Sequence, residues 1–220
     1  MNPLQAPLRQ GLDALALALT DGQVSQLLDY LGLIQKWTKV YNLTAVRDPA
    51  EMLTHHLLDS LAVVAPLRRQ LAAVAEVQAK LRLLDVGSGA GLPGVVIAIC
   101  CPEITVHCVD TVAKKAAFIQ QVAVTLKLPN LRGIHARVEN LTETYQVISS
   151  RAFASLLDFT NWSAQVLAEQ GIWMAMKGKH PAEEMATLPS NVSVFHVEQL
   201  DVPGLGAERC IVWMRPAVVG

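Results

Sequence analysis

A glycine-rich segment at residues 83–94 constrains the possible folds of this chain more than any other feature. Its sequence is LLDVGSGAGLPG, and it joins the apolar run 81–86 to a second apolar run at 95–101. We interpret this pattern as a buried strand, a tight loop and a buried helix, the first half of a βαβ nucleotide-binding unit. Glycine suits such a loop because it adopts positive φ and lets ligand atoms approach the backbone.

Two acids help to choose between the ligands that such a loop binds. Residues 89–94 match the dinucleotide pattern G-x-G-x-x-G. Asp85, however, lies two residues before Gly87, the first glycine of the loop, where its charge would repel a pyrophosphate. The same carboxylate suits an ammonium or sulfonium centre, held directly or through water. Asp110 ends the next apolar segment, where an acid usually binds a ribose diol, and NAD and S-adenosylmethionine both have one. Asp85 therefore favours S-adenosylmethionine; a glycine loop retained only for a tight turn is the alternative.

Composition predicts a globular protein without a membrane span. Of the 220 residues, 52% are hydrophobic and 17% are charged, and no uninterrupted apolar run approaches the ~18 residues that a span needs. The first residues lack a basic segment and Asp13 interrupts their apolar part, so we expect no signal peptide and a cytoplasmic location. The four cysteines show no C-x-x-C spacing, which favours buried thiols and no metal site.

Hydrophobic periodicity divides the chain into a helical part and an α/β part. Helices are expected at 21–41, 49–64 and 67–81, after a leucine stripe at Leu12, Leu15, Leu17 and Leu19. Further on, we expect strands at 81–86, 104–109, 131–135, 146–149, 172–177, 192–197 and 209–213, with helices at 111–126 and 156–170. The last two strands are expected to form an antiparallel hairpin, which is usual in methyltransferases, whereas a dehydrogenase half would continue with parallel units.

This alternation predicts a class I Rossmann-like S-adenosylmethionine-dependent methyltransferase fold. We expect a seven-stranded, mostly parallel sheet with a C-terminal antiparallel hairpin, preceded by a helical extension. The predicted division is a helical region at 1–80, packed on the core, and a methyltransferase domain at 81–220.

Polar residues between the first helices have structural and functional interpretations. Asp48 and Pro49 are typical of a helix N-cap followed by a first-turn proline. His56 and Asp59 are one helical turn apart, a spacing that allows a hydrogen-bonded pair near a site. A satisfied core histidine is the alternative for His56, and turn chemistry is the alternative for Asn42 and Thr44.

Taken together, the motifs resemble those of one family. They are YNLT at 41–44, RDP at 47–49, His56 with LDS at 58–60, the loop at 85–94, RVE at 137–139, SRAFA at 150–154 and KG at 177–178. Their order is similar to that in the bacterial glucose-inhibited division protein B family, the small-subunit ribosomal RNA guanine-N7 methyltransferases, over residues 37–213. Asn140, where a second acid is common, and the extra serine before Arg151 are small departures.

The resemblance implies methylation of one guanine in the decoding-site region of 16S ribosomal RNA, and it implies roles for individual residues. S-adenosylmethionine is expected to be bound by Asp85, Gly87, Ser88, Gly89, Gly91, Leu92, Asp110, Val138, Glu139 and Arg151. Within this set, Asp110 would bind the ribose, Val138 the adenine face and Glu139 its amino group. Arg151 and His56 would position the guanine, and Arg47, Arg137 and Lys177 would contact RNA.

The acceptor atom explains why the chain offers no convincing Ser-His-Asp or Cys-His set. Guanine N7 carries a free lone pair at neutral pH, so the transfer needs no general base to begin. Catalysis then consists largely of positioning, which can supply ~7–11 kcal/mol. N7 lies on the major-groove edge, which is inaccessible in A-form RNA, so the target is expected to be unpaired or splayed out.

The net charge of −1 is unusual for a protein that binds naked RNA. Basic pairs such as Arg68-Arg69 and Lys114-Lys115 are more often solvated faces than binding patches. We therefore expect a monomer that recognises the small ribosomal subunit or its assembly intermediate, with shape supplementing charge. The alternatives are a methyltransferase for a small molecule or protein, an NAD-binding oxidoreductase, and a non-enzymatic RNA-binding assembly factor.

Overall fold

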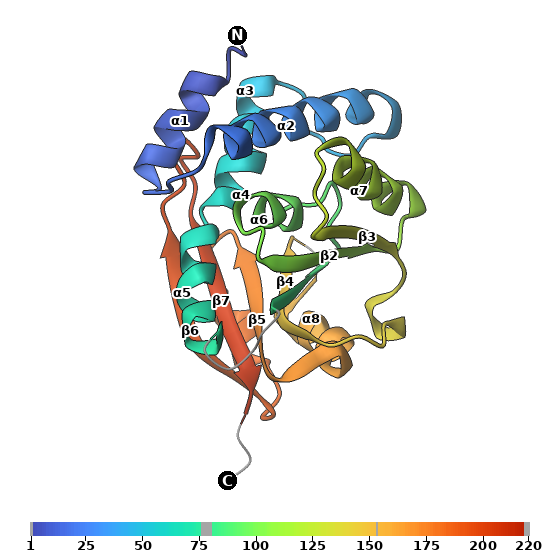
Figure 1. Ribbon diagram of the computed structural model, residues 1–220. Coiled ribbons are helices and arrows are strands. Elements are labelled where there is room, and N and C mark those ends of the chain that lie inside the picture. Colours follow the sequence, from blue (N-terminus) through green and yellow to red (C-terminus); the bar gives the residue numbers. More distant parts are fainter. Residues whose placement is uncertain (1, 76–80, 153, 218–220) are drawn as a thin grey trace.

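The computed structural model describes residues 2–75, 81–152 and 154–217, and a seven-stranded sheet forms its centre (Figure 1). The strands are β1 (Leu81–Val86), β2 (Ile104–Asp110), β3 (Leu131–His135), β4 (Tyr145–Arg151), β5 (Leu167–Lys177), β6 (Val192–Leu200) and β7 (Arg209–Pro216). Their order is β3-β2-β1-β4-β5-β7-β6. Strands β1 to β5 pair in parallel, whereas β7 pairs antiparallel with both β5 and β6. The predicted mostly parallel sheet with a terminal hairpin is confirmed.

Helical segments precede the sheet and alternate with its strands. They are α1 (Gln5–Ala14), α2 (Asp21–Tyr41), α3 (Pro49–Met52), the π-helix η1 (Leu53–Leu58), α4 (Asp59–Leu61), α5 (Val64–Ala75), α6 (Gly94–Cys100), α7 (Ala113–Thr125), the 3-10 turn η2 (Val138–Asn140), α8 (Leu156–Ser163), the 3-10 turn η3 (Ala164–Val166) and α9 (Ala182–Ala186). The Asp48 carboxylate accepts hydrogen bonds from the amides of Ala50 and Glu51, which confirms the predicted N-cap. None of these described helices is long and apolar enough to cross a membrane.

Several predicted boundaries were wrong. The helix expected at 156–170 ends at Ser163 because Leu167 already pairs with Tyr145 of β4. Strand β4 continues to Arg151, which was expected in a loop. Helix α5 begins at Val64 rather than residue 67, and residues 76–80 of that expected helix lie outside the described residues.

Two further differences concern short elements. The leucine stripe spans the end of α1, which stops at Ala14, so Leu15, Leu17 and Leu19 follow the helix. The helix expected at 49–64 contains the π-helical turn of η1, and α9 was not predicted.

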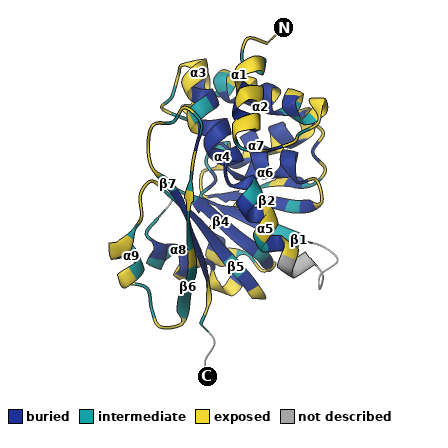
Figure 2. Cartoon of the chain, turned by 90° about the vertical axis from the view of Figure 1, so that its left-hand side faces the viewer, coloured by how far each residue is buried: buried dark blue, intermediate teal, exposed yellow. Residues whose placement is uncertain are grey.

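Two hydrophobic layers cover the two faces of the sheet. Leu83 and Leu84 are adjacent in β1 but belong to different clusters, because successive strand residues point to opposite faces. The first cluster also includes Leu8 of α1 and Ile34 of α2, and Figure 2 shows the strands buried between these layers. Since one cluster joins the first helices to the sheet, the division at residue 80 stays a prediction. All four cysteines are buried free thiols, as expected.

Candidate active site

Three cavities lie side by side along the edge of the sheet where the parallel strands end. The large cavity, of about 470 Å³, is lined from β1, β2 and η2. The small cavity, of about 150 Å³, lies between the glycine loop, η1 and Arg151. The basic cavity, of about 370 Å³, lies between η1, β4, β5 and the start of β7. Strand order reverses between β1 and β4, the position at which open α/β sheets bind ligands.

Shared wall residues connect the three cavities. Ala152 lines all three of them. Gly87 separates the large cavity from the small one, and His56 and Arg151 separate the small cavity from the basic one. A ligand that extends across the glycine loop can therefore reach a second molecule in the basic cavity.

The glycine loop leaves open space on its ligand side and packs tightly behind. Gly89 has a φ of 59°, and a Cβ there would meet no atom within 4 Å. By contrast, a Cβ on Gly94 would lie 2.5 Å from the Cys108 sulfur. The Tyr30 hydroxyl of α2 donates a hydrogen bond of 2.7 Å to the Ala90 carbonyl. The helical region thus fixes the loop from behind while its front face stays accessible.

Asp85 lies beneath this loop and lines none of the three cavities. Its carboxylate accepts hydrogen bonds from the Gly94 amide (2.9 Å) and the Ser149 hydroxyl (3.0 Å), and its side chain is fully buried. Burial raises the pKa of Asp85 to about 7, although both hydrogen bonds oppose that rise. In this structure the carboxylate joins β1, β4 and the start of α6.

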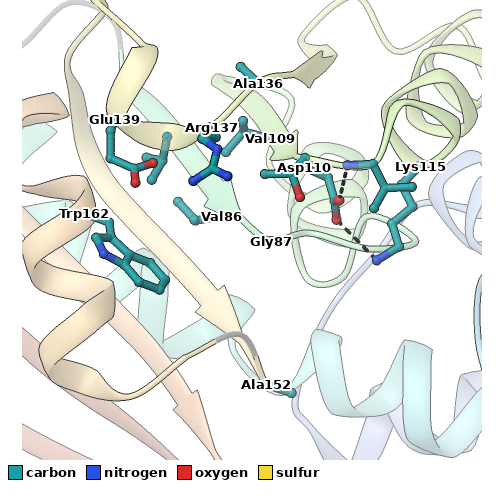
Figure 3. Close-up of a pocket in the computed structure, with 13 residues that line it drawn as sticks. Val86, Gly87, Val109, Asp110, Lys115, Ala136, Arg137, Glu139, Ala152 and Trp162 are labelled. Carbon is teal, nitrogen blue, oxygen red and sulfur yellow. Dashed lines mark hydrogen bonds and ion pairs between the residues drawn. The ribbon is translucent and has the colours of Figure 1, made fainter.

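Asp110 is the acid that faces the large cavity (Figure 3). One of its oxygens accepts a hydrogen bond from the Gly89 amide (3.0 Å) and the other from the Val112 amide (2.8 Å). The Lys115 ammonium lies 3.6 Å from the same carboxylate. Since a carboxylate has about four lone-pair directions, Asp110 retains acceptor capacity for a ligand hydroxyl.

The opposite wall of the large cavity combines polar and apolar surfaces. Val138 and Glu139 come from η2, and Trp162 comes from α8. In Figure 3, Glu139 and Trp162 lie across the cavity from Asp110, with Arg137 between them. Sequence reasoning did not single out Trp162, which is 40% exposed and lines this cavity.

The basic cavity is organised around one buried carboxylate. One oxygen of Asp59 accepts a hydrogen bond from Nη1 of Arg151 and the other from Nε of Arg209, both at 2.9 Å. Arg151 also donates to the His55 carbonyl (3.1 Å). Arg209 was missed by sequence reasoning because it begins an antiparallel strand, whose amino end lies at the edge where the parallel strands end.

His56 forms the wall between the small and basic cavities. It is 6% exposed, and its Nε2 lies 2.9 Å from the Thr44 hydroxyl. Burial lowers the pKa of His56, and the positive charge of Arg151 lowers it further, so the ring is neutral at pH 7. Among the described residues, its buried Nδ1 has no hydrogen-bond partner. The predicted pair with Asp59 is not a hydrogen bond; Asp59 is bonded to the two arginines.

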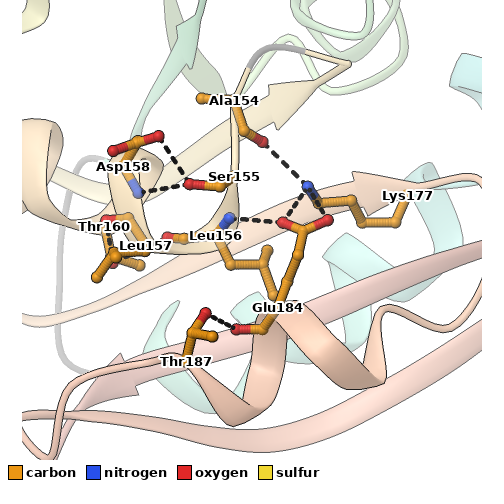
Figure 4. A network of polar contacts seen from close by, with 9 residues as sticks. All are labelled: Ala154, Ser155, Leu156, Leu157, Asp158, Thr160, Lys177, Glu184 and Thr187. Carbon is orange, nitrogen blue, oxygen red and sulfur yellow. Dashed lines mark hydrogen bonds and ion pairs between the residues drawn. The ribbon is translucent and has the colours of Figure 1, made fainter.

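Lys177 is already bonded within the protein (Figure 4). Its ammonium donates to the Glu184 carboxylate (2.8 and 3.1 Å) and to the Ala154 carbonyl (3.0 Å). Glu184 also accepts a hydrogen bond from the Leu156 amide (2.7 Å). Lys177 lines the basic cavity and ties α9 to the start of α8.

The structure separates the other two residues predicted to contact RNA. Arg137 lines the large cavity rather than the basic one. Arg47 lines none of the three cavities; it donates to the Thr38 carbonyl (3.0 Å) and the Asn42 side chain (2.6 Å) at the end of α2. Of the predicted guanine and RNA residues, only Arg151, His56 and Lys177 meet at the basic cavity.

The large and small cavities fit S-adenosylmethionine. Asp110 offers an acceptor for a ribose diol, Val138 and Trp162 offer apolar surface, and Gly89 leaves an open cradle beside the backbone amides. Together with the sheet order and the reversed β7, these features define a Rossmann-like methyltransferase.

Solved structures show the same fold. The protein TrmN from Thermus thermophilus aligns with a TM-score of 0.55 at 16% identity, covering 75% of this chain and 53% of that one. Coclaurine N-methyltransferase, solved with N-methylheliamine and SAH, aligns with a TM-score of 0.51 at 13% identity, covering 90% and 72%. Identities this low establish the fold alone.

Sequence relatives identify the family. A protein from Albidiferax ferrireducens named ribosomal RNA small subunit methyltransferase G is 70% identical over the full length of both chains. One of the same name from a Polaromonas species is 73% identical, covering 94% of this chain and 92% of its own. Residues 23–212 match the GidB family model, described as rRNA small subunit methyltransferase G, and the chain belongs to this family. The resemblance seen in the motifs is confirmed, and the protein is an S-adenosylmethionine-dependent methyltransferase.

Proposed function

We propose that this protein transfers a methyl group from S-adenosylmethionine to N7 of one guanine in 16S ribosomal RNA, with the two substrates meeting at the wall formed by Arg151, His56 and Ala152. The observation that carries this proposal is the continuity of the three cavities along one sheet edge. The methyl donor occupies the large and small cavities, and the guanine occupies the basic cavity.

The large cavity holds the adenosine part of the donor. Asp110 accepts hydrogen bonds from the ribose hydroxyls, because its carboxylate faces the cavity while two backbone amides fix its orientation. Val138 contacts the adenine face, and Glu139 accepts from the adenine amino group. Trp162 adds an aromatic surface from α8.

The small cavity holds the amino-acid end of the donor. Gly87, Ser88, Gly89 and Leu92 line it from the loop, and Arg151 lines it from β4. Gly91 shapes the loop from behind, where a Cβ would lie 2.4 Å from Val95. Asp85 acts indirectly, through the Gly94 amide that holds the start of α6.

Chemistry at the basic cavity requires orientation rather than proton removal. S-adenosylmethionine, when bound, would supply a methyl group on a sulfonium; as guanine N7 bonds to the methyl carbon, the carbon–sulfur bond breaks and S-adenosylhomocysteine leaves as a neutral thioether. The Arg151 guanidinium can donate to guanine O6 and leave the N7 lone pair directed at the small cavity. His56 is neutral, so it adds no positive charge beside a base that becomes positive during the transfer. The Asp59 carboxylate offsets part of the charge of the arginines.

The substrate context is proposed to be the small ribosomal subunit or its assembly intermediate, recognised by a monomer. The net charge of −1 supports recognition by shape as well as by charge. Much of the basic charge near the cavity is also compensated by Asp59 and Glu184. Arg47 and Arg137 would then contact RNA at the rim, away from the basic cavity.

Methyl transfer with labelled donor tests this proposal. Tritiated S-adenosylmethionine is offered with small subunits lacking the modification, with naked 16S RNA, and with panels of proteins and metabolites. We expect label at N7 of a single guanine. Label on a protein or metabolite instead, or at another atom of the base, would contradict the proposal.

Arg151→Ala tests the meeting point of the two substrates. We expect kcat/KM for RNA to fall about 1,000-fold, which corresponds to ~4 kcal/mol of transition-state stabilisation, because one side chain contacts both cavities. Arg132→Ala, an exposed change at the amino end of β3, is the matched control. Normal RNA methylation by the Arg151→Ala protein would remove this residue from the mechanism.

A further inference from the structure

We propose that Asp59 is a positioning residue that holds Arg151 and Arg209 as a paired guanidinium site for one backbone phosphate of the RNA beside the target guanine. This inference rests on the proposed function and assigns a substrate group to the basic cavity. It adds Asp59 and Arg209, which come from the first helical segments and from the last strand, to the residues that recognise RNA.

The geometry fixes both guanidinium groups from the same side. The Asp59 side chain is 3% exposed, and each of its oxygens accepts one hydrogen bond of 2.9 Å from a different arginine. Nη1 of Arg209 also donates a hydrogen bond to the Glu208 carbonyl (2.8 Å), and Nη1 of Arg151 donates one to the His55 carbonyl. The hydrogen bonds among the described residues therefore use Nη1 of Arg151 and Nε and Nη1 of Arg209. Nη2 of each arginine remains for a ligand.

The charges around the basic cavity favour an anion. Its lining includes three cations and one carboxylate: Arg151, Lys177 and Arg209 against Asp59. Lys177 is compensated by Glu184, so the uncompensated positive charge resides on the arginine pair. A planar guanidinium matches phosphate oxygens well, and two of them held at a fixed relative orientation lose little further freedom on binding.

Two sources could supply an anion here, an RNA phosphate or the carboxylate at the amino-acid end of the methyl donor. Arg151 lines both the small and the basic cavity, whereas Arg209 lines the basic cavity and not the small one. The paired site is therefore on the acceptor side of the wall, which favours phosphate.

Arg209→Gln is the first test, with small ribosomal subunits from cells lacking this protein as the RNA probe. We expect weaker RNA binding, a several-fold higher KM for RNA with kcat little changed, and an unchanged Kd for S-adenosylmethionine by calorimetry. The slope of log K against log salt should become shallower by about 0.7, the value for one phosphate contact on single-stranded RNA. Arg215→Gln is the matched control, an exposed arginine at the other end of β7 that packs over Phe195.

Asp59→Asn is the second test, because the positioning role predicts an effect opposite to simple electrostatics. Removing an acid from an RNA-binding surface should strengthen RNA binding at low salt. We expect the reverse, several-fold weaker binding, because an amide cannot hold both guanidinium groups. Calorimetry with S-adenosylmethionine checks that the variant is folded; if it is not, the Arg209→Gln measurements decide.

The outcomes separate this inference from the proposed function. RNA binding by Arg209→Gln with the wild-type salt slope would overturn the phosphate site, as would tighter RNA binding by folded Asp59→Asn. Loss of donor affinity in Arg209→Gln without loss of RNA affinity would assign the pair to the donor carboxylate instead. If the wild-type protein methylated no RNA, both proposals would fail. If it methylated RNA normally and both variants bound RNA as the wild type does, the phosphate site alone would be overturned.

Discussion

The two halves of the proposed active site are built from the chain in different ways. The methyl-donor half, formed by the large and small cavities, takes most of its lining from residues 86–139. The acceptor half, formed by the basic cavity, combines residues 55–59 with 151–152, 176–178 and 209. A local motif therefore describes the first half, whereas only the folded sheet creates the second.

Their buried carboxylates differ in the same way. Asp85 is bonded to neutral groups, a backbone amide and a serine hydroxyl, and its pKa is raised to about 7. Asp59 is equally buried but is bonded to two guanidinium groups. Asp85 therefore completes the packing beneath the glycine loop, whereas Asp59 fixes the orientation of two guanidinium groups at the basic cavity. The comparison predicts that changes in each half affect different ligands.

The largest effect expected on donor binding comes from the methyl-donor half. Asp110→Ala should weaken S-adenosylmethionine binding about 100-fold, close to 3 kcal/mol, because it removes the ribose acceptor and two loop hydrogen bonds. RNA affinity should stay within twofold of wild type. Calorimetry with the donor and filter binding with RNA measure the two quantities, and Asp201→Ala, an exposed acid after β6, is the control. Equal losses for both ligands would remove the distinction between the halves.

A pair of glycine substitutions tests how tightly the methyl-donor half is packed. Gly94→Ala places a methyl group 2.5 Å from the Cys108 sulfur and 2.9 Å from an Asp85 oxygen. We expect a loss of roughly 1–3 kcal/mol in the free energy of unfolding. Gly32→Ala in α2, where a Cβ meets no atom within 4 Å, should instead stabilise the protein by about 0.5–1 kcal/mol. Urea denaturation measures both, and a stable Gly94→Ala protein would contradict this packing.

A further expected effect is a pH dependence that distinguishes Asp85. Its folded pKa of about 7 lies above the ordinary aspartate pKa of 3.8, so between these values the folded protein binds a proton that the unfolded chain does not. Stability due to this group is therefore greatest at low pH, falls as pH rises toward about 7, and is constant above that. The slope contributed is at most about 1.4 kcal/mol per pH unit.

Asp85→Asn should remove that contribution while retaining an acceptor for the Gly94 amide. The difference in unfolding free energy between variant and wild type should thus increase from pH 4 to pH 7, in favour of the variant. Urea titrations at each pH measure it, with Asp201→Asn as the exposed control. A difference that is constant across this range would show that Asp85 does not carry the shifted pKa.

Much of the fold could be predicted because its signals are local. Strand β3 was predicted at its observed bounds, and β1 and α2 likewise, since apolar periodicity and capping residues define them. The boundary between α8 and β5 was not predicted, because the apolar sequence around Leu167 suits either a helix or a strand. Pairing with Tyr145 of β4 decides it, and such a contact is not visible in one sequence.

The site shows the same limit. The glycine loop, Asp110 and the pair Val138–Glu139 lie at or after the ends of successive strands, and Gly87, Asp110, Val138 and Glu139 line the large cavity. Arg209 follows no recognisable motif, and only the antiparallel pairing of Lys177 with Cys210 brings it to the same edge. The hydrogen bonds that hold the Asp85 carboxylate to Gly94 and Ser149 could not be predicted either, and a contact between Asp85 and the donor stays a prediction.

The reversal of β7 has a consequence for synthesis of the protein. The contact between Arg209 and Asp59 joins positions 150 residues apart. During translation, the segments proposed to bind the methyl donor emerge from the ribosome well before β7, which completes the basic cavity. An unfinished chain thus lacks the proposed pocket for the base, and we expect the enzyme to become competent only once β7 has been added.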